Sequence, residues 1–494
     1  MKNRHHSRRH LVAGLRGMVA AAIASVAGTV GAQLFRPQTV AIENVRIVVG
    51  DGTVIERGTV VIRDGRLVAV GSSVAVPDRA ARVDGSGKTV TPGLIDALGS
   101  LGSNASGGSD GMHFAADAFD RFDTRAIRSA LSQGVTTVYL PARGERGVTG
   151  VGAVVRFTPG PDDTFGEVAV EHAALCVNMG SGASALQRLQ MLDALRKRLK
   201  AARTYRESLE TYESELEDYE KKIKERAANP AQAGGPGGST GAGGTGGGSG
   251  QGGSGVMQDP PRPPGGGGPP GAGPRGGQPG GGQAGTGAQG GNEELRKPQK
   301  PRRDAGAEMI LKAIDREMPV RVYATRQEDI LNAIELAQEF NLRLIIEGAA
   351  EADLVAAAID NAGASVVFDH AASRDRTADG LGDRLSRAAA SAAHQGLSWY
   401  LGSGRDAGSA GRFLLAMAQH AANAAGHADA ISLLTGAAAD LLELGERTGR
   451  LTPGREADLV LWSGDPLDPS SKVELVYING SIAWRQPAAK EGSS

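Results

Sequence analysis

The middle of the chain alternates short apolar runs with amphipathic stretches, and this alternation limits its fold more than any other feature. Runs such as TTVYLPA, PVRVYAT and LRLIIEG are typical of strands that are buried on both faces. Between two of them, QEDILNAIELAQEF repeats apolar residues at helical spacing, with Ile330, Ile334 and Ala337 near one face. Apolar strands separated by helices indicate a parallel sheet covered by helices. The number and span of these units predict an eight-stranded β/α barrel of the TIM type.

Both ends of the chain have a different pattern, which is typical of β-structure. Near the N-terminus, apolar residues alternate through Val45, Ile47 and Val49, with turn signals at Gly50 to Gly52 and at Asp64-Gly65. Near the other end, ADLVLWSGDPLD and KVELVYINGSIAW have the same character. We therefore expect short antiparallel strands at both ends of the chain and an α/β region between them.

Two segments interrupt the α/β region. Residues 184–229 predict a long amphipathic helix, either an arm or a coiled-coil-like hairpin. A solvated helix with one face on the barrel is the alternative. The apolar residues of its second half recur at spacings of three and four: Leu209, Tyr212, Leu216, Tyr219 and Ile223. Residues 230–303 are rich in Gly and Pro, cannot bury an apolar core, and are predicted to be a disordered spacer.

The N-terminus predicts an export signal over residues 1–32. A basic start, MKNRHHSRRH, precedes an apolar stretch and small residues before a cut after Ala32. Arg8 and Arg9 resemble a twin-arginine signal, with a Sec-type signal as the alternative. Arg16 interrupts the apolar run, so we expect no membrane span after signal removal. The expected location is periplasmic or secreted.

Net charge and cysteine content indicate which partners and which kind of stabilisation to expect. The net charge is −1, so nothing favours nucleic acid as a partner. The chain has one cysteine, Cys176, so no internal disulfide is expected. The fold must therefore be stabilised by its packed core.

Five motifs in order resemble the amidohydrolase superfamily, in its imidazolonepropionase-like branch. They are GTVVIRDGRLVAVG, GKTVTPGLIDA, QGVTTVYLPARG, PVRVYATRQEDILNAIELAQEFNLRLIIEGA and RTGRLTPGREADLVLWSGDPLD. The resemblance implies a composite β-sandwich built from residues 36–91 and 450–486, around a (β/α)8 barrel over residues 92–449. It also implies a hydrolase that acts on carbon–nitrogen bonds other than peptide bonds, using one or two divalent metals such as Zn to activate water.

The positions that carry metal ligands in this superfamily hold other residues here. The resemblance implies an H-x-H after the first barrel strand, a Lys on the fourth, a His on each of the fifth and sixth, and an Asp on the eighth. The matching positions in this chain are Leu98, Ser100, Cys176, Tyr323, Gly348 and Gly404. Leu and Gly side chains offer no metal donor, and neutral Ser and Tyr oxygens are poor ligands for Zn. We therefore predict no metal and no cofactor.

Some polar residues still fall at predicted strand ends. Asp369, His370 and Asp406 are weak candidates for catalysis. Tyr323, Glu347 and Arg405 are weak candidates for lining a ligand pocket that needs no metal. Since Asp369 and His370 are adjacent, only one of the two is expected to face the barrel mouth.

The functional hypothesis is a catalytically degenerate amidohydrolase that acts as a binding or partner protein. Its partner would be an active relative or a second copy of itself. One alternative is an active amidohydrolase with a rearranged site. Another is a scaffold that works through its helical arm and linker.

Overall fold

The structure is a computed structural model that describes residues 39–101, 112–180, 184–228, 295–369, 381–406, 408–411, 414–425 and 427–487. The chain divides into two compact units, Met1–Arg206 with Arg303–Ser494, and Glu207–Arg302. The predicted signal over residues 1–32 lies outside the described residues, as does most of the predicted spacer. Among the described helices, none is long and apolar enough to span a membrane.

The first sheet joins strands from the two ends of the described chain. Its order is β17-β16-β15-β5-β1-β2-β3, with β4 beside β1. The strands are β1 (Thr39–Val48), β2 (Val54–Arg63), β3 (Arg66–Gly71), β4 (Ala81–Asp84), β5 (Thr89–Pro92), β15 (Leu459–Trp462), β16 (Val473–Ile478) and β17 (Ser481–Arg485). Asp64 and Gly65 join β2 to β3, both with positive φ, as a tight hairpin turn requires. Leu459 of β15 pairs with Pro92 of β5, so the sheet depends on both segments.

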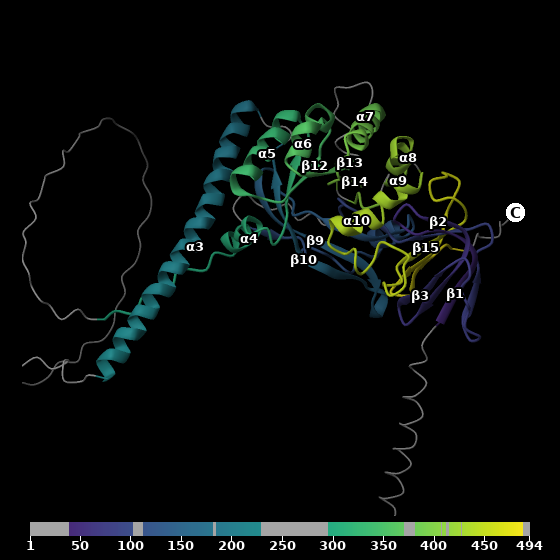
Figure 1. The fold of residues 1–494 in the computed structure, drawn as a ribbon, viewed down its shortest axis with the longest axis horizontal. Coiled ribbons are helices and arrows are strands. Elements are labelled where there is room, and N and C mark those ends of the chain that lie inside the picture. The colour runs from purple at the N-terminus through teal and green to yellow at the C-terminus, as the bar shows by residue number, and fades with distance from the viewer. Residues whose placement is uncertain are drawn as a thin grey trace, which may run out of the picture. The chain divides into compact units, whose positions relative to one another are not determined.

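The second sheet is nearly closed and resembles a barrel (Figure 1). Its order is β14-β13-β12-β11-β10-β9-β8-β6, with β7 beside β9. The strands are β6 (Leu94–Asp96), β7 (His113–Phe114), β8 (Val135–Leu140), β9 (Gly147–Pro159), β10 (Phe165–Asn178), β11 (Val320–Ala324), β12 (Leu344–Gly348), β13 (Ser365–Asp369) and β14 (Trp399–Gly402). The two edges meet where Gly404 N–H donates to the Leu98 carbonyl at 2.8 Å.

Helices pack against the outer face of this sheet. α5 (Gln327–Phe340) contacts β11 and β12, and buries Ile330, Ala333 and Ile334 on the face that the sequence predicts. The other helices are α2 (Thr124–Leu131), α3 (Ala185–Ala228), α4 (Ala305–Ile314), α6 (Ala356–Asn361), α7 (Leu381–His394), α8 (Leu414–Ala425), α9 (His427–Leu433) and α10 (Gly436–Leu441), with short 3-10 turns η1 (Pro161–Asp163) and η3 (Ala352–Val355). Inside the sheet, Ile95, Tyr139 and Cys176 form a separate core with residues of α10.

The predicted fold class, a TIM-type barrel with an additional β-domain, is confirmed. One part departs from regular β/α alternation: β9 runs antiparallel to both β8 and β10. Short connections, rather than helices, join these strands. The physical reason is that antiparallel neighbours can be linked by a tight loop, whereas parallel ones need a crossover of a dozen or more residues.

A buried arginine fastens the barrel-like sheet to the first sheet. The Arg156 side chain of β9 is fully buried and donates through Nη2 to Asp458 Oδ2 at 2.6 Å and through Nη1 to Glu167 Oε2 at 3.1 Å. Asp458 stands just before β15 and also accepts from the Asn479 N–H, between β16 and β17, at 2.9 Å. One guanidinium therefore joins β9 to the C-terminal part of the first sheet.

Replacing Arg156 with Ala is expected to lower the free energy of unfolding by about 3–5 kcal/mol, because the buried Asp458 carboxylate loses its charged partner. The comparison variant is Arg82→Ala, which breaks an exposed pair with Glu43 and should cost less than about 1 kcal/mol. Urea unfolding of both variants measures the difference. Equal losses would contradict the assignment of Arg156 as the junction.

Candidate functional site

The carboxyl ends of the parallel strands meet at one end of the barrel, which is where enzymes of this architecture place their active sites. Leu98 and Ser100 follow β6, Tyr323 lies on β11, and Gly404 follows β14. Gly348 ends β12, and Cys176 lies two residues before the end of β10. The structure thus places the positions singled out from the sequence around one mouth of the barrel.

Asp96, at the end of β6, and the residues after it form the contacts that close the barrel. Asp96 is fully buried and accepts from the backbone N–H groups of Leu98, Ser403 and Gly411 at 3.2, 2.9 and 2.9 Å, and from the Ser403 hydroxyl. The Leu98 backbone packs so closely on Gly402 that a Cβ added there would lie 2.5 Å from Leu98 Cβ. The carboxylate of Asp96 therefore holds the two edges of the sheet together.

The Cys176 thiol is closed off inside the barrel. The Tyr139 hydroxyl lies 3.2 Å from Cys176 Sγ, and the Ala142 N–H donates to the same sulfur at 3.4 Å. Burial raises the pKa of both the Cys176 thiol and the Tyr139 phenol. Since the thiolate rather than the thiol is the nucleophile, this burial disfavours Cys176 as a nucleophile at neutral pH.

Gly348 and Tyr323 occupy one crowded corner of the mouth. Gly348 has φ of +84°, and a Cβ added there would lie 3.0 Å from Tyr323 Cε2. A larger side chain at this position would therefore be strained and would collide with the ring. Burial raises the pKa of Tyr323, so its phenol stays protonated and is a poor ligand for a divalent metal.

A guanidinium lies inside the barrel, one layer below the mouth. Arg321 of β11 donates through Nε to Glu347 Oε1 of β12 at 2.6 Å, and through Nη2 to the Ala97 carbonyl after β6 at 2.6 Å. It also lies over the Tyr139 ring of β8, 3.6 Å from the ring centre. Arg321 and Glu347 are each only 2% exposed. A permanent organic cation therefore connects four strands across the interior.

Two further arginines lie at the rim. Arg405 follows β14, lies over the Tyr323 ring at 4.9 Å, and donates to the Ala142 carbonyl at 3.3 Å. Arg143 follows β8 and donates to the Arg405 carbonyl. Burial, and then the neighbouring positive charge of Arg405, lower the pKa of Arg143. The rim therefore holds arginines and a carboxylate together, because the charge of Asp406 also acts on Arg143.

The three catalytic candidates are not shown to converge. Asp369 is buried at the end of β13, and Asp406 is exposed after Arg405. His370 lies outside the described residues. Among the residues that the structure describes, no three His, Cys, Asp or Glu side chains are grouped to hold a metal ion. The donor set among these described residues therefore does not fit the divalent metals that the sequence resemblance implies.

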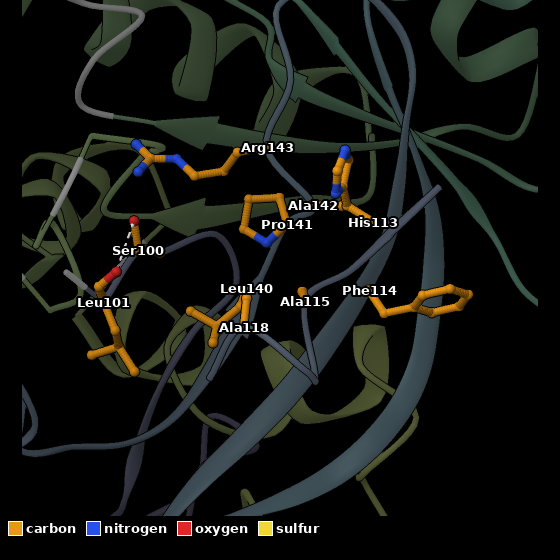
Figure 2. Close-up of a pocket in the computed structure, with 11 residues that line it drawn as sticks. Ser100, Leu101, His113, Phe114, Ala115, Ala118, Leu140, Pro141, Ala142 and Arg143 are labelled. Atoms are coloured by element: carbon orange, nitrogen blue, oxygen red, sulfur yellow. Dashed lines mark hydrogen bonds between the residues drawn. The ribbon is translucent and has the colours of Figure 1, made fainter. Parts of the chain in front are cut away.

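A pocket opens beside the rim, lined by the segments after β6 and β8 and by β7. Its polar side chains are Ser100, His113 and Arg143. Figure 2 shows the Arg143 and Ser100 side chains toward one side of the pocket and the His113 ring toward the other. The rest of the wall is apolar, with Leu101 and Leu140 among its residues. The cavity has a volume of about 40 Å³, so only a very small group fits inside it.

Sequence reasoning did not identify Asp96, Arg143 or Arg321. One signal for Arg321 and Glu347 was present: each is a charged residue inside an otherwise apolar strand, PVRVYA and LIIEG. Because side chains alternate along a strand, a charge in such a run faces the barrel interior and needs a partner there. Glu347 was considered as a ligand contact, and the structure places it on Arg321.

Comparisons with known proteins agree with this architecture. Residues 303–483 match the amidohydrolase family. An amidohydrolase from Thermotoga maritima MSB8 has a similar fold, with a TM-score of 0.62 at 21% identity, covering 90% of this chain and 100% of that chain. The A. niger ochratoxinase aligns at 15% identity and a TM-score of 0.46, over 92% of this chain and 97% of that chain. No curated protein matches the chain.

The internal ion pair allows a double-mutant test. Arg321→Met alone should lower the free energy of unfolding by about 3–5 kcal/mol, because Glu347 is left as an unpaired buried charge. Adding Glu347→Leu should recover part of that loss, because both charges are then gone. Urea unfolding of the two single variants and the double variant measures the coupling. Losses that simply add would contradict a paired role.

Proposed function

We propose that this protein is a member of the amidohydrolase family, whose model residues 303–483 match, and that it works as a binding protein without metal-dependent hydrolysis. The observation that supports this most strongly is the Arg321 guanidinium, paired with Glu347 in the interior just below the mouth. Because the Glu347 carboxylate is bound to Arg321, it is occupied as a salt-bridge acceptor and does not serve as a donor to a metal ion. The lack of a metal-donor group among the described residues points the same way.

The retained motifs are explained by folding alone. Asp96 closes the barrel, and Gly348 and Gly402 allow close backbone approaches. These roles are needed whether or not the protein catalyses a reaction. A shared fold therefore does not imply a shared activity, and function has to be argued from the site.

The ligand that this site favours is a small anion, such as a carboxylate or a phosphate. Arg143 lines the pocket beside the rim; its Nη2 group donates to the Arg405 carbonyl, and its positive charge favours an anionic group. Ser100 adds a polar group on the same side of the pocket, and His113 adds one on the other side. Because the cavity has a volume of about 40 Å³, it accommodates little more than the anionic group itself.

Metal analysis tests the proposed loss of hydrolysis. Untagged protein, dialysed against Zn²⁺ and then against metal-free buffer, should retain far less than one equivalent by mass spectrometry. Calorimetric titration with Zn²⁺ or Mn²⁺ should give no saturable heat, because the described residues at the mouth include no group of three metal donors. One retained equivalent, together with turnover of a small cyclic amide that a chelator abolishes, would overturn the proposal.

Thermal unfolding tests the proposed ligand class. Millimolar acetate, succinate or phosphate should raise the unfolding midpoint of the wild-type protein, since a ligand that binds only the folded state stabilises it. Arg143→Met should remove most of that increase. Arg146→Met, which removes an exposed arginine three residues later, is the matched control and should keep it. An unchanged increase in Arg143→Met, or no increase in the wild type, would contradict an anion site there.

A further inference from the structure

The second half of α3 carries a regular apolar stripe. Between residues 207 and 226, every apolar or aromatic residue falls on one seam: Leu209, Tyr212, Leu216, Tyr219 and Ile223. The spacings are three, four, three and four, which is the a/d pattern of a heptad repeat. At about 1.5 Å per residue, the seam from Leu209 to Ile223 covers two heptads and roughly 21 Å of helix. The remaining positions are mainly charged.

None of the five side chains of this stripe is buried in the part of the chain that the structure describes. The buried residues of α3 are Met191, Leu192, Leu195, Leu199 and Ala202, all in its first half. Beyond Ala202, every residue of the helix is at least partly exposed, and Ile223 is 42% exposed. A helix that was only solvated would not need its apolar residues confined to one seam. The pattern is that of a helix with a partner.

We propose that residues 207–226 of α3 pair with the same segment of a second copy as an antiparallel coiled coil. This inference is independent of the proposed function. Charge complementarity identifies the second copy as the partner. Residues 207–220 contain acidic but no basic residues, whereas Lys221, Lys222, Lys224 and Arg226 make the end basic. An antiparallel arrangement places each basic end beside the acidic region of the other copy.

The heptad positions favour antiparallel over parallel pairing. In a parallel dimer, each tyrosine at a d position would face its own copy in one layer, and Glu215 at g would face Glu220 at e. In an antiparallel dimer, each a position faces a d position. Leu216 then packs on Tyr219 of the second copy and Ile223 on Tyr212, so each central layer combines one aliphatic and one aromatic side chain.

The same alignment sets the flanking charges. Glu215 faces Lys222 of the second copy, and this attraction occurs twice by symmetry. On the other flank Glu213 faces Glu220, which offsets part of the gain. The apolar layers must therefore supply most of the association energy, and one charged substitution in a central layer should abolish it.

Sedimentation velocity of the full chain tests the interface. The wild type should form a dimer that dissociates on dilution, and Leu216→Asp should raise the dissociation constant at least tenfold. Ser214→Asp, at the opposite f position, is the matched control and should dimerise like the wild type. An unchanged thermal midpoint in Leu216→Asp would show that the barrel is still folded. A monomeric wild type at tens of micromolar, or a Leu216→Asp variant that still dimerises, would overturn the proposal.

Engineered disulfides test the orientation. The double variant Glu215→Cys/Lys222→Cys should form covalent dimers on oxidation, because these g positions face each other only in the antiparallel pair. Glu215→Cys/Glu220→Cys should form far fewer, because these positions meet only in a parallel pair. Residues seven apart on one helix are about 10 Å apart, too far for a bond within the chain. Preferential crosslinking of the second variant would contradict the antiparallel arrangement.

Discussion

The buried ion pair between Arg321 and Glu347 is the interaction on which the interior of the barrel depends. It joins β11 to β12, reaches the chain after β6 through the Ala97 carbonyl, and stacks on Tyr139 of β8. A charge in such a place is tolerated only where a counter-charge and hydrogen-bond acceptors are fixed around it. The barrel interior is thus organised around a cation that belongs to the protein itself.

The surroundings of this pair follow from the same constraint. Cys176 and Tyr139 are neutral and hydrogen-bonded to each other. Tyr323 is protonated, and Gly348 leaves room for its ring. Arg156 is a second buried arginine, at the junction of the two sheets, where carboxylates from distant segments accept from its guanidinium. These polar groups connect strands, a role that does not depend on a bound metal.

The strands with continuous apolar runs were predictable, because β-branched residues bounded by helical patterns have few other structures. The antiparallel β9 was not among them, since GVTGVGAVVRFTP mixes glycines with apolar residues and carries no turn signal of its own. The positions of Leu98, Tyr323 and Gly348 could be assigned by resemblance. That Arg321 pairs with Glu347 depends on the relative register of β11 and β12, which a single sequence does not encode locally. The same holds for Arg143 and Arg405, which approach from loops far apart in the chain.

The most direct test of the central claim is anomalous scattering from crystals grown or soaked with Zn²⁺ or Mn²⁺, recorded at the absorption edge of each metal. The Arg321 guanidinium should stay on Glu347, and no anomalous peak should occur within the barrel mouth. An ordered ion held there by side chains, at ligand distances of about 2.0–2.3 Å, would contradict it.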